Sequence, residues 1–278
     1  MRIAICAPST PFTRDDAQRV VDLAATTHPS AELVFDDQCF IEAGHFAGHD
    51  ADRLEAFVRL ANDPSFSAVW FARGGYGACR IAGDAIPLLK AAARDKAYLG
   101  YSDQGNLLGA LYRGGIGRPA HGPMCADVRR EGGNCAITRA LDWLVGNAPQ
   151  SLEGHVQAGE KHAAFNLMTL AMMAGTPLMP DLEDHVLMVE EVSEYLYAFD
   201  RAFFHVATHL DVAGLKGLRL GRVSDVPDND RPFGEGVEEI ARRWCTKASI
   251  AYLGRADIGH DAENKVVPFG LASTSAAQ

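Results

Sequence analysis

The sequence predicts an α/β protein with a parallel sheet, because short apolar runs alternate with longer amphipathic segments along its first half. A run at 96–100 precedes one helical segment at 106–112. In parallel sheets of this kind, ligands bind at the carboxyl ends of the strands, where we expect the functional site. Three earlier strand-and-helix pairs carry the same pattern: 3–5 before 17–25, 32–35 before 51–61, and 68–71 before 78–93.

The second half of the chain repeats the alternation after a break. Between residues 146 and 160 the pattern lapses into Asn, Pro, Gln, Ser and Gly, which indicates a junction between domains. We therefore expect a first domain over residues 1–147 and a second domain over residues 160–278. In the second domain the pattern predicts strands at 186–189, 218–223 and 250–253, and helices at 197–210 and 237–244.

The composition is that of an ordinary globular protein, with 47% hydrophobic and 22% charged residues in a chain of 278. A net charge of −10 argues against binding to nucleic acid or anionic membranes, because both favour a basic surface. No apolar stretch approaches a membrane span, and the first residues lack the apolar core of a secretion signal. The six cysteines include no Cys-x-x-Cys pair, so we expect reduced thiols and a cytoplasmic protein.

Ser102 stands between the apolar run at 96–100 and the helical segment at 106–112, in Gly100-Tyr101-Ser102-Asp103. A strand-to-helix turn lifts a hydroxyl out of the sheet and aims the first N–H groups of the helix at its target. The residues therefore allow a nucleophile. They also allow a serine that merely caps the next helix, and taken alone they favour this second interpretation.

A glycine-rich turn, Arg73-Gly74-Gly75-Tyr76-Gly77, follows the run at 68–71. Glycines let the backbone approach a ligand closely and expose its N–H groups. The turn is compatible with a phosphate cradle, with an oxyanion donor beside a nucleophile, or with a tight strand-to-helix connection. The Rossmann glycine spacing and the Walker lysine are both absent, which disfavours a nucleotide site.

Carboxylates and histidines that could assist a nucleophile occur later in the chain. Glu190 and Glu191 end an apolar run, while His121 and His260 stand at the ends of expected strands. Charged side chains are mostly solvated, so the pattern alone does not single out one of them. No cluster has the spacing of metal ligands, and we expect neither a metal ion nor a cofactor.

Together these segments resemble the LD-carboxypeptidase family, the serine peptidases known as murein tetrapeptide carboxypeptidases. The resemblance covers nearly the whole chain, and the ordered set of motifs is far more specific than any one of them. The motifs are Ala7-Pro8-Ser9, Arg73-Gly74-Gly75-Tyr76-Gly77, Gly100-Tyr101-Ser102-Asp103, His121-Gly122-Pro123-Met124, Gly175-Thr176-Pro177, Val189-Glu190-Glu191 with Asp200-Arg201, and Gly259-His260.

The resemblance implies a flavodoxin-like parallel-sheet N-terminal domain and a smaller α/β C-terminal domain, with the active site between them. It implies that Ser102 is the nucleophile, that His260 is the general base and that Glu190 orients the imidazole. It also implies an oxyanion hole formed by the backbone N–H groups of Gly75 and Asp103.

Family members release the terminal D-alanine from muropeptide tetrapeptides in the cytoplasm, during cell-wall recycling, and are commonly homodimers. The resemblance thus implies a muropeptide substrate and a homodimer for this chain. A carboxypeptidase also needs a group that binds the terminal carboxylate. Arg73, Tyr76 and Arg201 are the candidate substrate-binding residues.

Two departures from the family pattern bear on substrate preference. Gln104-Gly105 stands where the family usually has a threonine or similar residue, and Ala163-Ala164-Phe165-Asn166 stands where it often has Trp-Gly-Gly-Asn. One alternative function is that of the family's immunity branch, which hydrolyses peptidyl-adenylates such as processed microcin C. Another is a non-catalytic module that binds an anionic ligand.

Overall fold

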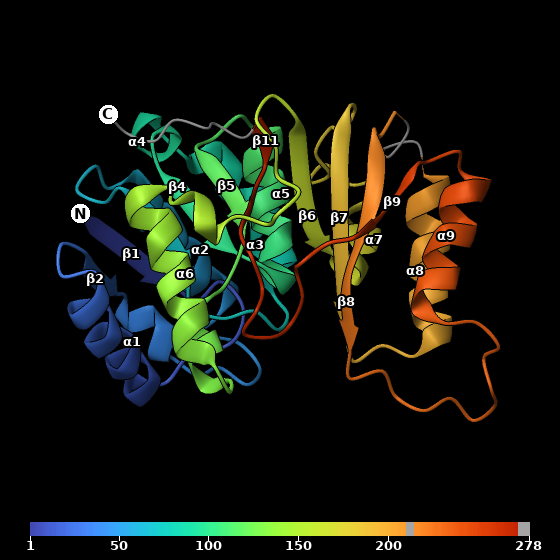
Figure 1. Ribbon diagram of the computed structural model, residues 1–278. Helices are drawn as coiled ribbons and strands as arrows, with labels where there is room; N and C mark the ends of the chain where they lie inside the picture. Colours follow the sequence, from blue (N-terminus) through green and yellow to red (C-terminus); the bar gives the residue numbers. More distant parts are fainter. Residues whose placement is uncertain (210–213, 272–278) are drawn as a thin grey trace.

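Two mostly parallel β-sheets organise the protein in a computed structural model that describes residues 1–209 and 214–271 (Figure 1). The first sheet has the order β10-β5-β4-β3-β1-β2. Strands β1 to β5 are parallel, and their 2-1-3-4-5 order is that of flavodoxin-like folds, which confirms the predicted α/β class. The strands are β1 (Arg2–Cys6), β2 (Glu32–Phe35), β3 (Ala68–Phe71), β4 (Ala97–Gly100), β5 (Arg118–His121) and β10 (Val267–Pro268).

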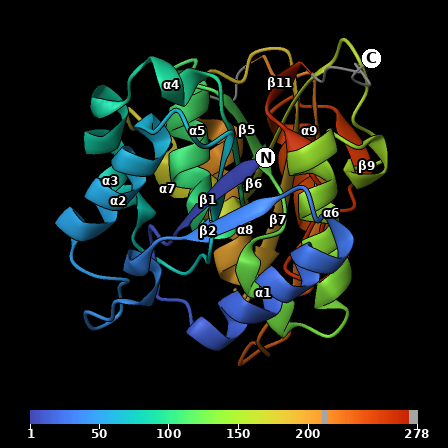
Figure 2. The same ribbon diagram turned by 90° about the vertical axis from the view of Figure 1, so that its left-hand side faces the viewer.

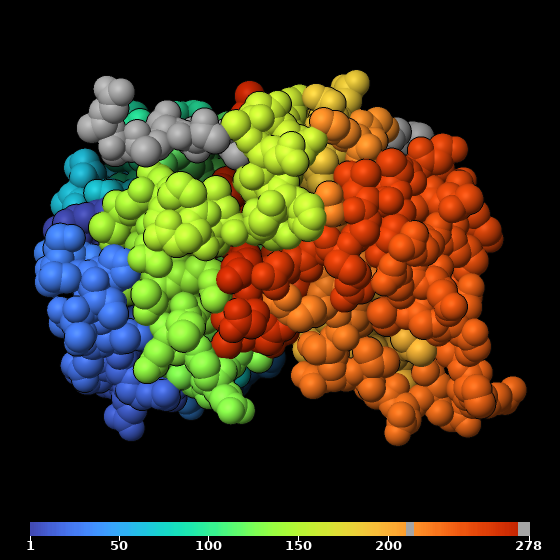
Figure 3. Space-filling view, viewed as in Figure 1, coloured from blue at the N-terminus to red at the C-terminus, as the bar shows by residue number. Residues whose placement is uncertain are grey.

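The second sheet has the order β11-β6-β7-β8-β9, with β6 to β9 parallel and β11 antiparallel at one edge. Because β10 pairs with β5 and β11 pairs with β6, the end of the chain crosses from one sheet to the other. We call the part of the protein built on the first sheet the first lobe and the part built on the second sheet the second lobe. Figure 3 shows this segment where the two lobes meet. The strands are β6 (Lys161–Asn166), β7 (His185–Val192), β8 (Gly217–Ser224), β9 (Tyr252–Arg255) and β11 (Gly270–Leu271).

Helices cover both faces of the first sheet, with α1 and α6 on one face and α2 to α5 on the other (Figure 2). Alternate residues of the buried strands face these two layers: Ile3 and Ile5 pack toward α1 and α6, while Ala4 and Cys6 face the opposite core. The helices are α1 (Arg14–Thr27), α2 (Asp50–Asn62), α3 (Ala78–Ala85), α4 (Ala91–Arg94), α5 (Gly105–Arg113), α6 (Gly133–Gly146), α7 (Leu167–Met173), α8 (Leu196–Thr208) and α9 (Val237–Lys247).

The single helix predicted over 78–93 is wrong. The structure has α3, a 3-10 turn at Ile86–Leu88 and α4, because Pro87 lacks an N–H and its ring would clash with the carbonyl of residue 83. The sequence pattern also does not identify α6. The predicted end of the helix at residue 210 lies outside the described residues.

A shared core fixes the two lobes relative to each other. The apolar cluster beside α2 to α5 continues through α7 into the second lobe, where Phe199 and Phe203 of α8 belong to it. Helices α5 and α7 meet at Gly109, where an added Cβ would lie 3.0 Å from Met173 Cε. In the described ranges, no helix combines the length and the apolarity needed to cross a lipid bilayer.

Candidate active site

Ser102 lies directly beyond the carboxyl end of β4, in a 3-10 turn at Ser102–Gln104 that leads into α5. Its φ of 60° places a non-glycine residue in the left-handed region. Such backbone costs on the order of 1–3 kcal/mol and persists only where the surroundings enforce it. A sharp strand-to-helix turn of this kind is how an exposed nucleophile is presented above a sheet.

The glycine-rich turn after β3 lies against Ser102. A Cβ added to Gly74 would stand 3.2 Å from Ser102 Oγ. Gly75 has a φ of 109°, and a Cβ there would lie only 2.6 Å from Thr10 Cγ2, so this position requires glycine. The peptide group between Gly74 and Gly75 is thereby held beside the serine, the position that a donor to an oxyanion would occupy.

The buried Asp103 carboxylate joins three loops at the carboxyl ends of the strands. It accepts hydrogen bonds from the Ser9 hydroxyl, from Ala78 N at 2.8 Å and from Asn106 Nδ2 at 3.2 Å. Burial raises the pKa of Asp103 above its usual value, and these hydrogen bonds offset that increase only in part. Because its carboxylate makes these contacts between loops, the group of Asp103 that remains for an interaction with a ligand is its backbone N–H.

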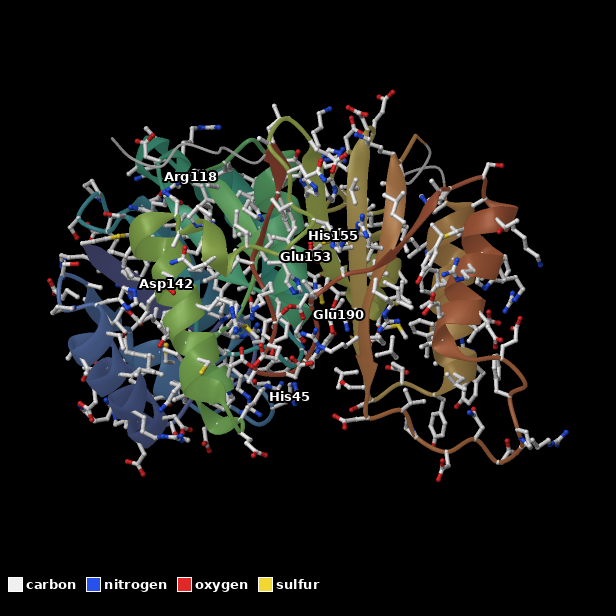
Figure 4. All side chains as sticks on the ribbon, in the orientation of Figure 1. His45, Arg118, Asp142, Glu153, His155 and Glu190 are labelled. Carbon is white, nitrogen blue, oxygen red and sulfur yellow. The ribbon has the colours of Figure 1, made fainter. Side chains whose placement is uncertain are left out.

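Glu190 and His260 form a buried pair on the second lobe. The carboxylate of Glu190, on β7, is fully buried, and its Oε2 lies 2.6 Å from His260 Nδ1. Figure 4 labels Glu190 between the two sheets. A carboxylate accepts hydrogen bonds, so Nδ1 carries the hydrogen and Nε2 is left as the basic nitrogen. Burial by itself lowers the pKa of His260, but the charge of Glu190 and the hydrogen bond to it produce a net increase.

The candidate nucleophile and base line one cavity of about 490 Å³. Ser102 enters it from the first lobe and His260 from the loop after β9. Beneath His260 lies the ring of Tyr101, with the two ring centroids 4.8 Å apart. The Tyr101 hydroxyl donates to Asp127 Oδ1 at 2.8 Å, which fixes the ring that supports the imidazole.

Three arginines line the same cavity: Arg73, Arg129 and Arg130. Arg129 pairs with Asp16 at 2.6 Å, and Arg130 pairs with Asp127 at 2.8 Å. Among the described residues, Arg73 has no carboxylate within ion-pair distance; it donates only to the Pro11 carbonyl, at 3.1 Å. Burial and the nearby charge of Arg129 lower the pKa of Arg73, and the charge of Asp16 opposes this shift only in part, so an anion in this cavity would stabilise the guanidinium.

Arg201 lies elsewhere. It is exposed on α8, where its guanidinium stands 5.7 Å from the centre of the Tyr197 ring. The described lining of the cavities beside Ser102 does not include it. The structure therefore brings together Ser102, His260, Glu190, Gly75 and Arg73, and it leaves Arg201 apart.

A second cavity, of about 480 Å³, adjoins the other side of Ser102. Tyr76 lines it with an exposed ring, together with Glu191 and methionines of α7. The buried carboxylate of Glu191 accepts hydrogen bonds from Asn166 Nδ2, Met168 N and Val192 N. Burial, with a smaller contribution from the charge of Glu190, raises the pKa of Glu191 to about 7.

Sequence reasoning missed Tyr101 and Asp127 as supports of the imidazole, and Arg129 and Arg130 as cavity cations. The consecutive arginines were the only visible signal for the latter pair. Over residues 1–209 and 214–271, no three His, Cys, Asp or Glu side chains gather as a metal site would require. No described residues are therefore assigned to a metal ion.

Two family models match most of the chain in order. The model described as the LD-carboxypeptidase N-terminal domain matches residues 3–122. The model described as the LD-carboxypeptidase C-terminal domain matches residues 163–274. The first match includes Ser102 and the glycine-rich turn, and the second includes Glu190 and His260.

Individual proteins are similar over most of their length. A murein tetrapeptide carboxypeptidase of Pseudomonas aeruginosa is 29% identical over 248 residues, covering 81% of this chain and 78% of the relative. The crystal structure of a muramoyltetrapeptide carboxypeptidase from Oxalobacter formigenes has a TM-score of 0.79 at 23% identity, covering 98% and 96% of the two chains. The microcin C7 self immunity protein MccF, in complex with aspartyl sulfamoyl adenosine, has a TM-score of 0.77 at 16% identity, covering 97% and 91%. At these identities the two structures show a common fold.

Proposed function

Because this chain belongs to the LD-carboxypeptidase family, we propose that it is a serine-type carboxypeptidase that releases the terminal D-alanine of muropeptide tetrapeptides. The observation that carries the proposal is the common cavity of Ser102 and His260, with Glu190 hydrogen-bonded behind the imidazole. The murein tetrapeptide carboxypeptidase among its relatives supports the substrate class.

In the proposed reaction, Ser102 Oγ attacks the carbonyl carbon of the scissile amide while His260 Nε2 takes the hydroxyl proton. Glu190 stabilises the imidazolium that forms, through its hydrogen bond to Nδ1. The N–H groups of Gly75 and Asp103 stabilise the oxyanion. His260 then donates its proton to the leaving amine, and a water molecule hydrolyses the acyl-enzyme by the reverse sequence of proton transfers.

Arg73 is the group that we assign to the terminal carboxylate of the substrate. Its guanidinium lines the catalytic cavity without an ion-pair partner among the described residues, and guanidinium and carboxylate are complementary in charge and in hydrogen-bond geometry. Tyr76 lines the cavity on the other side of Ser102, where we assign it to the acyl part of the substrate. We also propose that the protein acts in the cytoplasm and forms a homodimer. Light scattering in solution would test the dimer.

A second candidate substrate is a peptidyl-adenylate. It is favoured by the exposed Tyr76 ring beside Ser102, which offers a face on which a base could stack. The same nucleophile would attack an acyl group in either substrate. A non-catalytic binding module, in contrast, would show no turnover, and its ligand binding would not depend on the Ser102 hydroxyl.

The deciding experiment is mass spectrometry of a disaccharide tetrapeptide incubated with the protein or with its Ser102→Ala variant. Ser249→Ala is a control, because Ser249 is also a serine with a positive φ, of 58°, but it is exposed and lies beyond α9. We expect loss of one alanine with the unmodified protein and with Ser249→Ala only. Loss of an alanine with Ser102→Ala would show that Ser102 is not the nucleophile. Loss with none would overturn the muropeptide substrate, and a sulfamoyl- or phospho-linked aminoacyl adenosine would be tried next.

A further inference from the structure

His121 ends β5 and lies buried beside the candidate site, although the proposed reaction does not use it. Its Nε2 lies 3.1 Å from Asn264 Oδ1, and the same oxygen accepts the Gly259 N–H at 3.1 Å. A backbone N–H only donates, so the atom that it contacts must be the amide oxygen of Asn264. It follows that His121 Nε2 carries a hydrogen and donates it to Asn264.

The His121 ring is neutral under ordinary conditions. Burial lowers the pKa of His121 to about 4, and the charges of His260 and Arg222 act in the same direction. Glu190 and the hydrogen bond to Asn264 oppose this shift without cancelling it. The ring therefore provides one fixed donor and adds no positive charge next to His260.

A short path through these contacts joins the nucleophile to the base. Gly100 of β4 is the register partner of His121 on β5, and Ser102 follows two residues after Gly100. From His121 the path crosses to Asn264 and then to Gly259, which precedes His260 in the chain. The path consists of chain neighbours, one pairing of adjacent strands and two buried hydrogen bonds, and such contacts restrict how far the residues that they join can move.

We propose that His121 and Asn264 form a positioning pair that holds His260 in register with Ser102 across the two lobes. This inference rests on the proposed roles of Ser102 and His260. The pair touches neither substrate nor the reacting atoms, and it acts through the backbone of Gly259.

Other contacts hold the rest of the same loop. Arg139 donates to the carbonyls of Ala262 and Asn264, at 2.7 and 3.0 Å, and Arg222 donates to Asp261 Oδ1 at 2.9 Å. The N–H of Gly259 is held by Asn264. Loss of the His121 donor should therefore leave the loop folded while it loosens the segment next to His260.

Three variants separate positioning from general stability. His121→Leu removes the donor, whereas His121→Gln keeps an amide N–H at a similar reach. His185→Leu is the matched control: His185 is also a buried histidine that bridges the lobes, through Nε2 to the Tyr112 hydroxyl at 2.7 Å, but it stands at the start of β7. Each folded variant is assayed for kcat and KM on a D-alanine-terminated muropeptide, and the His260 imidazole is titrated by NMR without substrate.

We expect His121→Leu to lower kcat by about 10- to 100-fold, with KM changed by less than about threefold, because small displacements of catalytic groups act on the chemical step. In the NMR titration, the pKa of His260 should fall toward its ordinary value as its hydrogen bond to Glu190 loosens. His121→Gln should retain most of kcat, and His185→Leu should retain all of it. Asn264→Leu should reproduce His121→Leu, and the double variant should be no worse than either single one.

An unchanged kcat and an unchanged His260 titration in both His121→Leu and Asn264→Leu would overturn the inference. So would an equal loss of kcat in His121→Gln and His121→Leu, because the donor would then be irrelevant. If the unmodified protein does not cleave muropeptides, the proposed function fails. The NMR titration then still decides whether His121 controls the environment of His260.

Discussion

Glu190 and Glu191 are consecutive buried residues of β7, and their carboxylates have different partners. Glu190 accepts the hydrogen bond of His260 Nδ1 at 2.6 Å. Glu191 accepts hydrogen bonds from Asn166 Nδ2 and from Met168 N, at the start of α7. Successive side chains of a strand point to opposite faces, so one carboxylate faces the loop of the candidate base while its neighbour stabilises a helix terminus.

Replacement of Glu190 by Gln should lower kcat by roughly 10³- to 10⁴-fold, because a neutral amide does not hold the imidazole in the required tautomer as a carboxylate does. The charge of Glu190 also raises the pKa of His260, so the acid limb of the pH–kcat/KM profile should move to lower pH in the variant. The profile is measured by release of D-alanine. Glu191→Gln is the control, and its acid limb should stay near that of the unmodified protein.

Glu191 should make stability depend on pH near neutrality. Its pKa in the folded protein is raised to about 7, so the folded state holds a proton that the unfolded state has already lost. The free energy of unfolding should therefore decrease as the pH rises from the ordinary carboxyl pKa to about 7. Urea unfolding of the unmodified protein and of Glu191→Gln, at several pH values, measures this contribution. A difference between the two that is constant across the range would contradict it.

Gly75→Ala should lower kcat by on the order of 10²-fold or more, because the new Cβ would meet Thr10 and force the oxyanion peptide to move. Gly83→Ala in α3 is the control, since nothing lies within 4 Å of its added Cβ. That change should leave kcat unaltered and stabilise the helix by roughly 0.5–1 kcal/mol. Equal kcat values for the two variants would argue against a catalytic role of the Gly75 peptide.

The positive φ of Ser102 should reduce the stability of the protein, and this effect can be measured apart from the loss of the hydroxyl. Ser102→Gly and Ser102→Ala should both abolish turnover, but the glycine variant should be more stable by about 1 kcal/mol, since glycine tolerates a positive φ. Denaturant unfolding measures the difference. The same pair of changes at Ser249 provides the reference for a positive φ outside the site. A difference at Ser249 with none at Ser102 would contradict strain at the nucleophile.

Arg73→Gln should raise KM by about 10-fold or more for a peptide that ends in a free carboxylate, because it removes a charge-assisted hydrogen bond. A peptide that ends in a carboxamide should be affected much less. Arg201→Gln, on the exposed surface of α8, should change neither value. Steady-state kinetics on both substrates tests this, and equal losses for the two substrates would argue against a role of Arg73 in binding the carboxylate.

Local patterns in the sequence are sufficient for the α/β class. Apolar runs such as 3–5 and 68–71 form buried strands, and Ser102 follows β4 as the run before it predicts. Local patterns also identify the glycine-rich turn, because positive φ angles at Gly75 and Gly77 demand glycine. Pro87 is a further local signal, because it divides the segment 78–93, which the periodicity predicts as one helix.

Local patterns thus predict many of the strands, helices and turns, because these depend on residues close together in the chain, although α6 is not among them. The family resemblance implies the pairing of Glu190 with His260, but the three-dimensional arrangement is needed to show that Arg73 and not Arg201 reaches the cavity and that Asn264 contacts His121. The Glu190–His260 and His121–Asn264 contacts join residues 70 and 143 positions apart. No periodicity records such pairs. They form because the chain runs from β9 of the second sheet through the loop of His260 to β10 of the first sheet, where β10 pairs with β5, the neighbour of β4.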